Sequence, residues 1–248
     1  MKLIILIVSI LLFTSTILLS QAHGIVNIGM RGPIQFMVTD SLGRRTGKDA
    51  RTGLSYQEIP NTGYGIGCCG SIDPADSGDD EGAEFTFLKS IDSSFHDKYT
   101  FQIFGIWHGI YQGGIDLFQT LGGKGTFSDE VGVIDTLQSV IYKINFSTDS
   151  TIPPTVTKIV DVPLLIQDLN NCSNLGLIKN QPLYRGLSTI AHQTDSTLRM
   201  NDTTKARYHL LRFGNLIDTA SADTSKIDSV AYSILKEDFN ILFRSGVK

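Results

Sequence analysis

The sequence predicts an α+β protein of two domains, an antiparallel β-sandwich followed by a small four-helix bundle. Between residues 24 and 150, short apolar runs alternate with clusters of glycine, aspartate and serine, which is typical of antiparallel strands joined by turns. After residue 160, apolar residues recur every three or four positions, the period of helices that bury one face. Prolines at 153 and 154 separate the two patterns, so we expect the sandwich at 23–150, a linker at 151–160 and the bundle at 161–248.

The chain begins with a segment typical of a secretory signal peptide. Lys2 precedes an apolar stretch from Leu3 to Leu19, and small and polar residues follow as far as Ala22. We expect 1–22 to be the signal peptide and the product to be secreted or extracytoplasmic, in the periplasm or at the cell surface. The alternative is an uncleaved anchor helix, because the stretch approaches the length that spans a bilayer. After cleavage we expect no stable membrane span.

The charge balance argues against nucleic acid as a partner. The chain has 21 Lys and Arg against 25 Asp and Glu, a net charge of −4 at pH 7. Nucleic-acid-binding domains usually carry a strongly basic surface. A mildly acidic chain is instead typical of a soluble protein.

In the β-rich part the strand candidates are runs of β-branched and aromatic residues. Alternation of apolar and polar residues, as from Tyr99 to Phe104, indicates strands with one buried face. The only Trp, Trp107, falls in the turn of an expected hairpin. The candidate strands are Ile34–Thr39, Glu84–Leu88, Tyr99–Ile106, Gly109–Leu117 and Ser139–Phe146.

The segment that follows the strand at 34–39 is rich in turn residues and in charge. Gly43 and Gly47 allow positive φ angles, and Asp40 can accept hydrogen bonds from backbone amides two residues on. Arg44 and Arg45 can pair with neighbouring carboxylates. They can equally face an anionic glycan or a lipid headgroup, so both are candidate ligand-binding residues.

The stretch from Gly32 to Asp49, with Glu58-Ile59-Pro60 and Tyr64 after it, resembles a module of many exported bacterial proteins. That module is marked by the pattern VTDPLGRRTGxDP followed by NEIPGA. Ser41 and Ala50 stand where the pattern favours proline. This difference alters the turns and removes no reactive side chain. The resemblance implies a β-rich domain without enzymatic activity.

Carboxylates are concentrated in the loop at 73–84. Oxygen-rich loops can hold Ca²⁺, although the spacing here is not that of an EF-hand, and a solvated acidic loop is the alternative. No other cofactor is expected. The candidate ligands of a structural calcium are Asp73, Asp76, Asp79 and Asp80.

Three cysteines, Cys68, Cys69 and Cys172, are disulfide candidates, because export permits disulfides. One of the adjacent pair can join Cys172, and free thiols are the other reading. A metal site on Cys68 and Cys69 is a further alternative, but it lacks a second close pair of ligands.

The helical part shows four periodic segments. The first begins near Val162, with Pro163 in its first turn, and Gly176 ends it. The second carries an apolar stripe from Leu183 to Ala191. Asn201 or Asp202 is expected to cap the third, and Ser225 the last.

This part resembles the FIMAH domain found at the C-termini of secreted bacterial proteins and polysaccharide-active enzymes. The features that carry the resemblance are Leu165, Leu169, the run Leu175–Asn180, and the stripes of the later helices. The resemblance implies an accessory domain that binds anionic polysaccharides. An ordinary solvated helix surface is the alternative explanation of the basic residues, and those proposed to bind the ligand are Lys179, Arg185, Arg207 and Arg212.

The sequence therefore predicts an exported binding or surface-interaction protein that is not an enzyme. It contains no Gly-x-Ser-x-Gly and no His-Glu-x-x-His motif. One alternative is a copper-dependent polysaccharide oxygenase, since cleavage after Ala22 would leave His23 as an N-terminal metal ligand. The other alternative is a structural component of the cell envelope or an adhesion protein.

Overall fold

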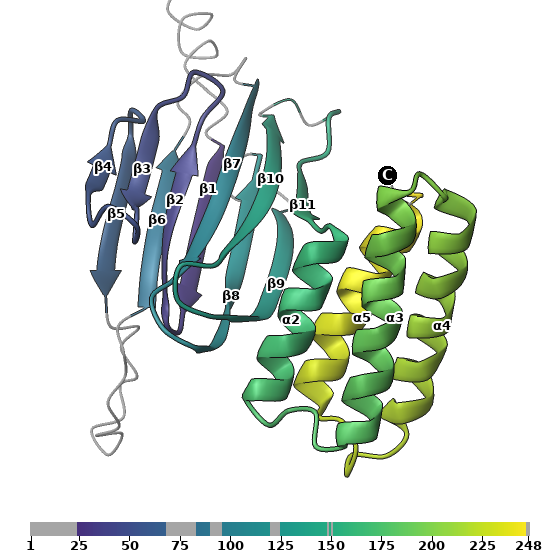
Figure 1. The fold of residues 1–248 in the computed structure, drawn as a ribbon. Coiled ribbons are helices and arrows are strands. Elements are labelled where there is room, and N and C mark those ends of the chain that lie inside the picture. Colours follow the sequence, from purple (N-terminus) through teal and green to yellow (C-terminus); the bar gives the residue numbers. More distant parts are fainter. Residues whose placement is uncertain are drawn as a thin grey trace, which may run out of the picture.

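The computed structural model of the protein describes residues 24–67, 83–89, 96–119, 125–147, 149 and 151–246. It is a mixed α+β fold of two antiparallel sheets and four helices (Figure 1). The residues expected to form the signal peptide lie outside the described part. So do the following candidate residues: His23, Cys68, Cys69, Asp73, Asp76, Asp79 and Asp80.

All strand pairings in the described residues are antiparallel. The first sheet has the order β5-β6-β1-β8-β9 and the second the order β11-β10-β7-β2-β3-β4. The strands of the first sheet are β5 (Thr62–Gly67), β6 (Ala83–Lys89), β1 (Ile25–Arg31), β8 (Gly109–Phe118) and β9 (Gly125–Ile134). Those of the second are β11 (Thr155–Ile159), β10 (Ser139–Ser147), β7 (His96–Gly105), β2 (Ile34–Thr39), β3 (Arg45–Lys48) and β4 (Ser55–Gln57).

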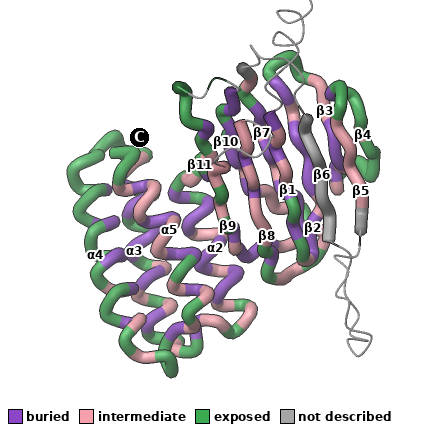
Figure 2. The backbone as a smooth tube through the Cα atoms, turned by 180° about the vertical axis from the view of Figure 1, so that it is seen from behind, coloured by how far each residue is buried: buried purple, intermediate pink, exposed green. Residues whose placement is uncertain are grey.

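The two sheets share one apolar core. Val26 and Ile28 of β1 contribute to it from the first sheet, and Phe36 and Phe101 from the second. The rings of Phe36 and Phe101 meet edge to face with centroids 5.3 Å apart. Along β10 buried residues alternate with more exposed ones, as the pleat of a half-buried strand requires. The sheets therefore face each other, and Figure 2 shows buried residues along the strands of both sheets.

The five expected strands are all present, and their ends differ from the expected ones by at most three residues. The expectation of a hairpin around Trp107 is wrong, because β7 and β8 belong to different sheets. Six further strands are present that were not expected. Glycines weaken the strand pattern in β3 and β5, and Ser128, Asp129 and Glu130 weaken it in β9. β11 lies inside the segment expected to be a linker, 151–160, because pairing with β10 outweighs the two prolines just before it.

The four helices are α2 (Val162–Asn174), α3 (Gln181–Arg199), α4 (Thr203–Ser221) and α5 (Ser229–Arg244). A side-chain oxygen caps each N-terminus, and the capping residues are Asp161, Asn180, Asp202 and Asp228. Gly176 follows α2 with φ 72°, as expected. The prediction that Ser225 caps the last helix is wrong, because Ile227 pairs with Ile178 in a β-bridge and delays the helix.

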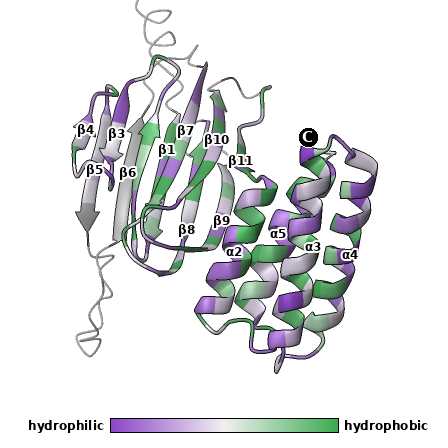
Figure 3. Ribbon diagram, in the orientation of Figure 1, coloured by the Kyte–Doolittle hydropathy of each residue, from purple (hydrophilic) through white to green (hydrophobic). Residues whose placement is uncertain are grey.

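The helices share a second apolar core, to which the sheet also contributes. Val133 of β9 belongs to this core, and Val131 packs against it. Figure 3 shows hydrophobic stretches along the helices, and in Figure 1 the helices lie beside the β9 and β11 edges of the sheets. Within the described ranges, no helix is both long and apolar enough to span a bilayer.

Candidate functional site

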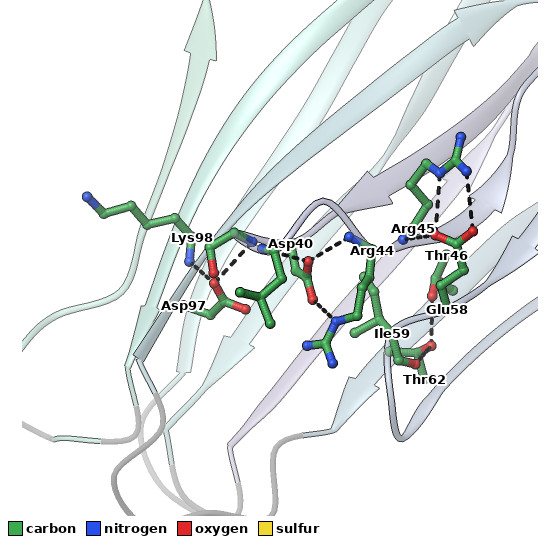
Figure 4. A network of polar contacts seen from close by, with 11 residues as sticks. Asp40, Arg44, Arg45, Thr46, Glu58, Ile59, Thr62, Asp97 and Lys98 are labelled. Atoms are coloured by element: carbon green, nitrogen blue, oxygen red, sulfur yellow. Dashed lines mark hydrogen bonds and ion pairs between the residues drawn. The ribbon is translucent and has the colours of Figure 1, made fainter.

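The turn between β2 and β3 holds a buried carboxylate, that of Asp40 (Figure 4). Its Oδ1 accepts hydrogen bonds from the backbone amides of Leu42, at 3.0 Å, and Arg44, at 2.9 Å. Its Oδ2 accepts one from Arg44 Nε at 2.6 Å. The expectation that Asp40 accepts a hydrogen bond from the amide two residues on is confirmed. The same carboxylate forms an ion pair with Arg44.

Arg45 is held in a similar way by Glu58. The Arg45 side chain donates to both carboxylate oxygens of Glu58, at 3.4 Å and 3.2 Å, and its guanidinium lies 3.7 Å from the ring centroid of Tyr56. These hydrogen bonds hold the pKa of Glu58 below its ordinary value. Arg44 and Arg45 therefore stabilise the turn, since each forms an ion pair with an acidic residue.

The four basic helix residues expected to bind a ligand are only partly brought together. Lys179 precedes α3 and donates to the carbonyl of Thr224 at 3.3 Å. Arg185 is exposed on α3. On α4, the guanidinium carbon of Arg207 lies 4.3 Å from the ring centroid of Phe243, and that of Arg212 lies 6.0 Å from the ring centroid of Tyr208.

The exposed side of α4 gathers cations and apolar side chains, and we call Lys205, Arg207, Tyr208, Leu211 and Arg212 the α4 face. Tyr208 is 59% exposed and Leu211 is 41% exposed. The three cations form no ion pair with any residue in the described ranges. Burial, and then the charges of Arg212 and Lys205, lower the pKa of the adjacent His209.

A buried ion cluster joins the sheets to the helices. Lys158 of β11 donates to Asp238 Oδ1 of α5 at 2.7 Å, and its Nζ lies 3.8 Å from Asp168 Oδ2 of α2. The side chains of all three residues are at most 2% exposed. We refer to them as the buried triad.

Electrostatics of the buried triad favour a proton on Asp168. Burial, and then the charge of Asp238, raise the pKa of Asp168 well above its ordinary value. Burial opposes the charge of Lys158, but Asp238 and Asp168 outweigh it and raise the Lys158 pKa. Asp168 Oδ1 and Asp238 Oδ2 have no other hydrogen-bond partner, and a proton on Asp168 satisfies both. The cluster then carries no net charge, which lowers the cost of its burial.

Further polar side chains extend from the triad into the sheets. The hydroxyl groups of Tyr111 and Tyr142 lie 3.4 Å apart, and burial, then Tyr111 and Glu130, raise the pKa of Tyr142. Ser128 donates a hydrogen bond to Glu130 Oε1. Burial raises the pKa of the nearby Glu237.

A groove of about 510 Å³ opens beside this network, between α5 and strands β9 and β11. Most of the residues that line it carry polar or charged side chains, and we call it the seam groove. It is lined by Ser128, Glu130, Val156, Thr157, Lys158, Tyr232, Ser233, Lys236, Glu237, Asn240, Ile241 and Arg244.

Sequence reasoning missed the buried triad because Lys158 and Asp238 are 80 residues apart. Lys158 also lies in the segment interpreted as a linker. One signal was present: Asp168 and Asp238 each fall among apolar residues of a helix, where an exposed carboxylate is not expected. A charged residue on an apolar stripe points to a buried partner.

The described histidines lie on different elements. His96 is the first residue of β7, and His108 lies in the bend before β8 with its Nδ1 3.8 Å from Asp135 Oδ2. His192 is exposed on α3 and His209 is buried on α4. No group of three or more His, Cys, Asp or Glu suited to a metal is found in the described part of the chain.

Cys172 is a free, fully buried thiol in the helical core. Burial, and then Asp168, raise its pKa.

No family model, curated protein or solved structure matches this chain. Function is therefore inferred from the side chains and their surroundings.

Proposed function

We propose that the protein is an exported binding protein without catalytic activity and that its α4 face binds an anionic polysaccharide. In this proposal the two sheets form a β-sandwich domain and the helices a separate bundle that presents the binding surface. The observation that carries it is the set of three cations, Lys205, Arg207 and Arg212, that have no acidic partner among the described residues.

The chemistry of the α4 face suits a polymer with repeated negative charges. Guanidinium groups bind sulfate and carboxylate groups through paired hydrogen bonds. Lys205 and Arg212 are seven residues apart, which is about 10 Å along the helix, so separate charges of one chain can reach both. The exposed ring of Tyr208 adds an apolar surface between them.

Other basic residues of the chain are less suited to binding a polyanion. Arg44 and Arg45 are held by Asp40 and Glu58, and binding an external anion would mean giving up those pairs. Lys158 is buried and keeps its proton, so it is not a nucleophile at neutral pH. These features support a binding role located on α4.

The test uses the whole exported chain and three polysaccharides, one sulfated, one carboxylated and one neutral. We expect binding to the charged polymers that weakens steeply between about 0.05 M and about 0.5 M salt, because exposed charges are screened. The triple variant Lys205→Gln, Arg207→Gln, Arg212→Gln should lose this binding. The matched control removes three cations of the sheets, through Lys48→Gln, Lys98→Gln and Lys143→Gln.

Two results would count against the proposal. One is the absence of binding to either charged polymer at low salt. The other is an equal loss of binding in the α4 variant and in the control, which would mean that overall charge alone attracts the polymer.

A further inference from the structure

The seam groove is long and has two unlike walls. On α5 its lining residues run from Tyr232 to Arg244 with helical spacing, so one face of the helix forms a wall over about 18 Å. β9 and β11, the last strands of the two sheets, form the other wall. A groove between a helix and strand edges has the shape of an extended peptide.

The wall formed by β11 is a strand edge. Val156, Thr157 and Lys158 all line the groove although they are consecutive. Successive side chains of a strand point to opposite faces, so the groove meets the edge of the strand. Among the described residues β11 pairs only with β10. Its outer amides and carbonyls are therefore available to pair with another strand.

The groove also contains two acidic side chains that form no ion pair with any described residue. Glu130 is 7% exposed and Glu237 is partly buried. Neither forms an ion pair in the described part of the chain: Lys158 is bound by Asp238 and Lys236 by Asp218, each at 2.7 Å. A buried carboxylate is costly without a counter-charge, so the groove is suited to a cation.

We propose that the seam groove binds an extended peptide segment that adds a strand to β11 and places one lysine or arginine side chain beside Glu130 and Glu237. Main-chain hydrogen bonds to β11 supply affinity, and the two carboxylates select the basic side chain. Arg244 at one end of the groove disfavours a second cation there. This site is separate from the α4 face and does not depend on it.

The experiment titrates the whole chain with short blocked peptides of alternating threonine and valine that differ only at the centre. The central residue is lysine, glutamine or glutamate, and butylammonium serves as a free cation. We expect the lysine peptide to bind about tenfold or more tightly than the glutamine peptide, because hydrogen bonds to charged groups are the stronger ones. The backbone amide signals of residues 155–159 should shift with the lysine peptide.

Variants locate the site. Glu237→Gln should reduce the preference for lysine over glutamine to less than about threefold, and Glu130→Gln should act in the same direction. Glu130 bonds to Ser128 inside the protein, so the more exposed Glu237 gives the decisive variant. Asp195→Asn removes a charge from α3 and should leave the preference unchanged.

Three results would overturn the proposal. The lysine and glutamine peptides bind equally, or the amides of residues 155–159 do not respond. In the third, butylammonium binds as tightly as the lysine peptide, which would make the groove a site for small cations.

Discussion

Replacing Lys158 by methionine tests the buried triad directly. The change keeps most of the side-chain volume and removes the donor that lies 2.7 Å from Asp238 Oδ1. Asp238 is fully buried, so its charge is left without compensation. Breaking a buried ion pair in this way costs about 3–5 kcal/mol. For a chain of this size that corresponds to a fall in Tm of roughly 6–20 °C.

A second variant separates the cost of the unpaired charge from the loss of packing. Lys158→Met combined with Asp238→Leu removes both charges, and replacing a buried pair by apolar residues is often neutral or stabilising. We therefore expect the double variant to recover most of the stability lost in Lys158→Met. The control is Lys226→Met, which removes an exposed pair with Asp223 and should leave the stability almost unchanged.

The assay is urea unfolding followed by circular dichroism and by the fluorescence of Trp107, which lies in the bend between β7 and β8. Coincident transitions by the two probes permit a free energy of unfolding to be assigned. A loss below about 1 kcal/mol in Lys158→Met, or a double variant no more stable than the single one, would refute the reasoning.

Three further predictions concern single positions. Gly47→Ala should destabilise by more than about 3 kcal/mol, because Gly47 has φ 124° and its added Cβ would clash with the carbonyl oxygen of Phe36. Gly43→Ala, with open space around it, should cost about 1 kcal/mol, and equal losses of the two variants in urea unfolding would contradict this prediction. Cys172 should resist alkylation in the folded protein and react after unfolding without a reductant, as peptide mapping would show; a requirement for reduction would instead indicate a disulfide. Because the pKa of Asp168 is raised in the folded protein, its stabilising contribution is complete below the pKa of about 3.9 in the unfolded chain and is lost as the pH rises above that value. Asp168→Asn should therefore reduce the loss of stability between about pH 4 and 7. An unchanged dependence of stability on pH would contradict the raised pKa of Asp168.

The class of fold could be predicted from local patterns. The burial alternation of β10 and the apolar stripe of α5 are properties of short segments, and the sequence displays them directly. The turn at Asp40 was equally readable, because a side chain that bonds amides two and four residues on needs no tertiary information. These features depend on neighbours in the sequence.

The buried triad and the seam groove could not be predicted in the same way. They require β11, an edge strand of five residues that forms only because β10 is present to pair with it. The partner of Lys158 lies on the last helix, and no local pattern relates two positions so far apart. The α4 face is intermediate: its cations could be chosen from the sequence, but their lack of acidic partners could not.

The pair between Lys158 and Asp238 has a consequence for the order of folding. Lys158 belongs to an edge strand and points inward, and an inward charge discourages wrong pairing at a sheet edge. Before α5 packs against the sheets, Lys158 lacks Asp238, which is its nearer acidic partner, and burying its charge is then more costly. The C-terminal helix brings Asp238, neutralises the lysine and allows the edge to settle. Helix α5 thus supplies the carboxylate that pairs with a strand residue 80 positions earlier in the chain.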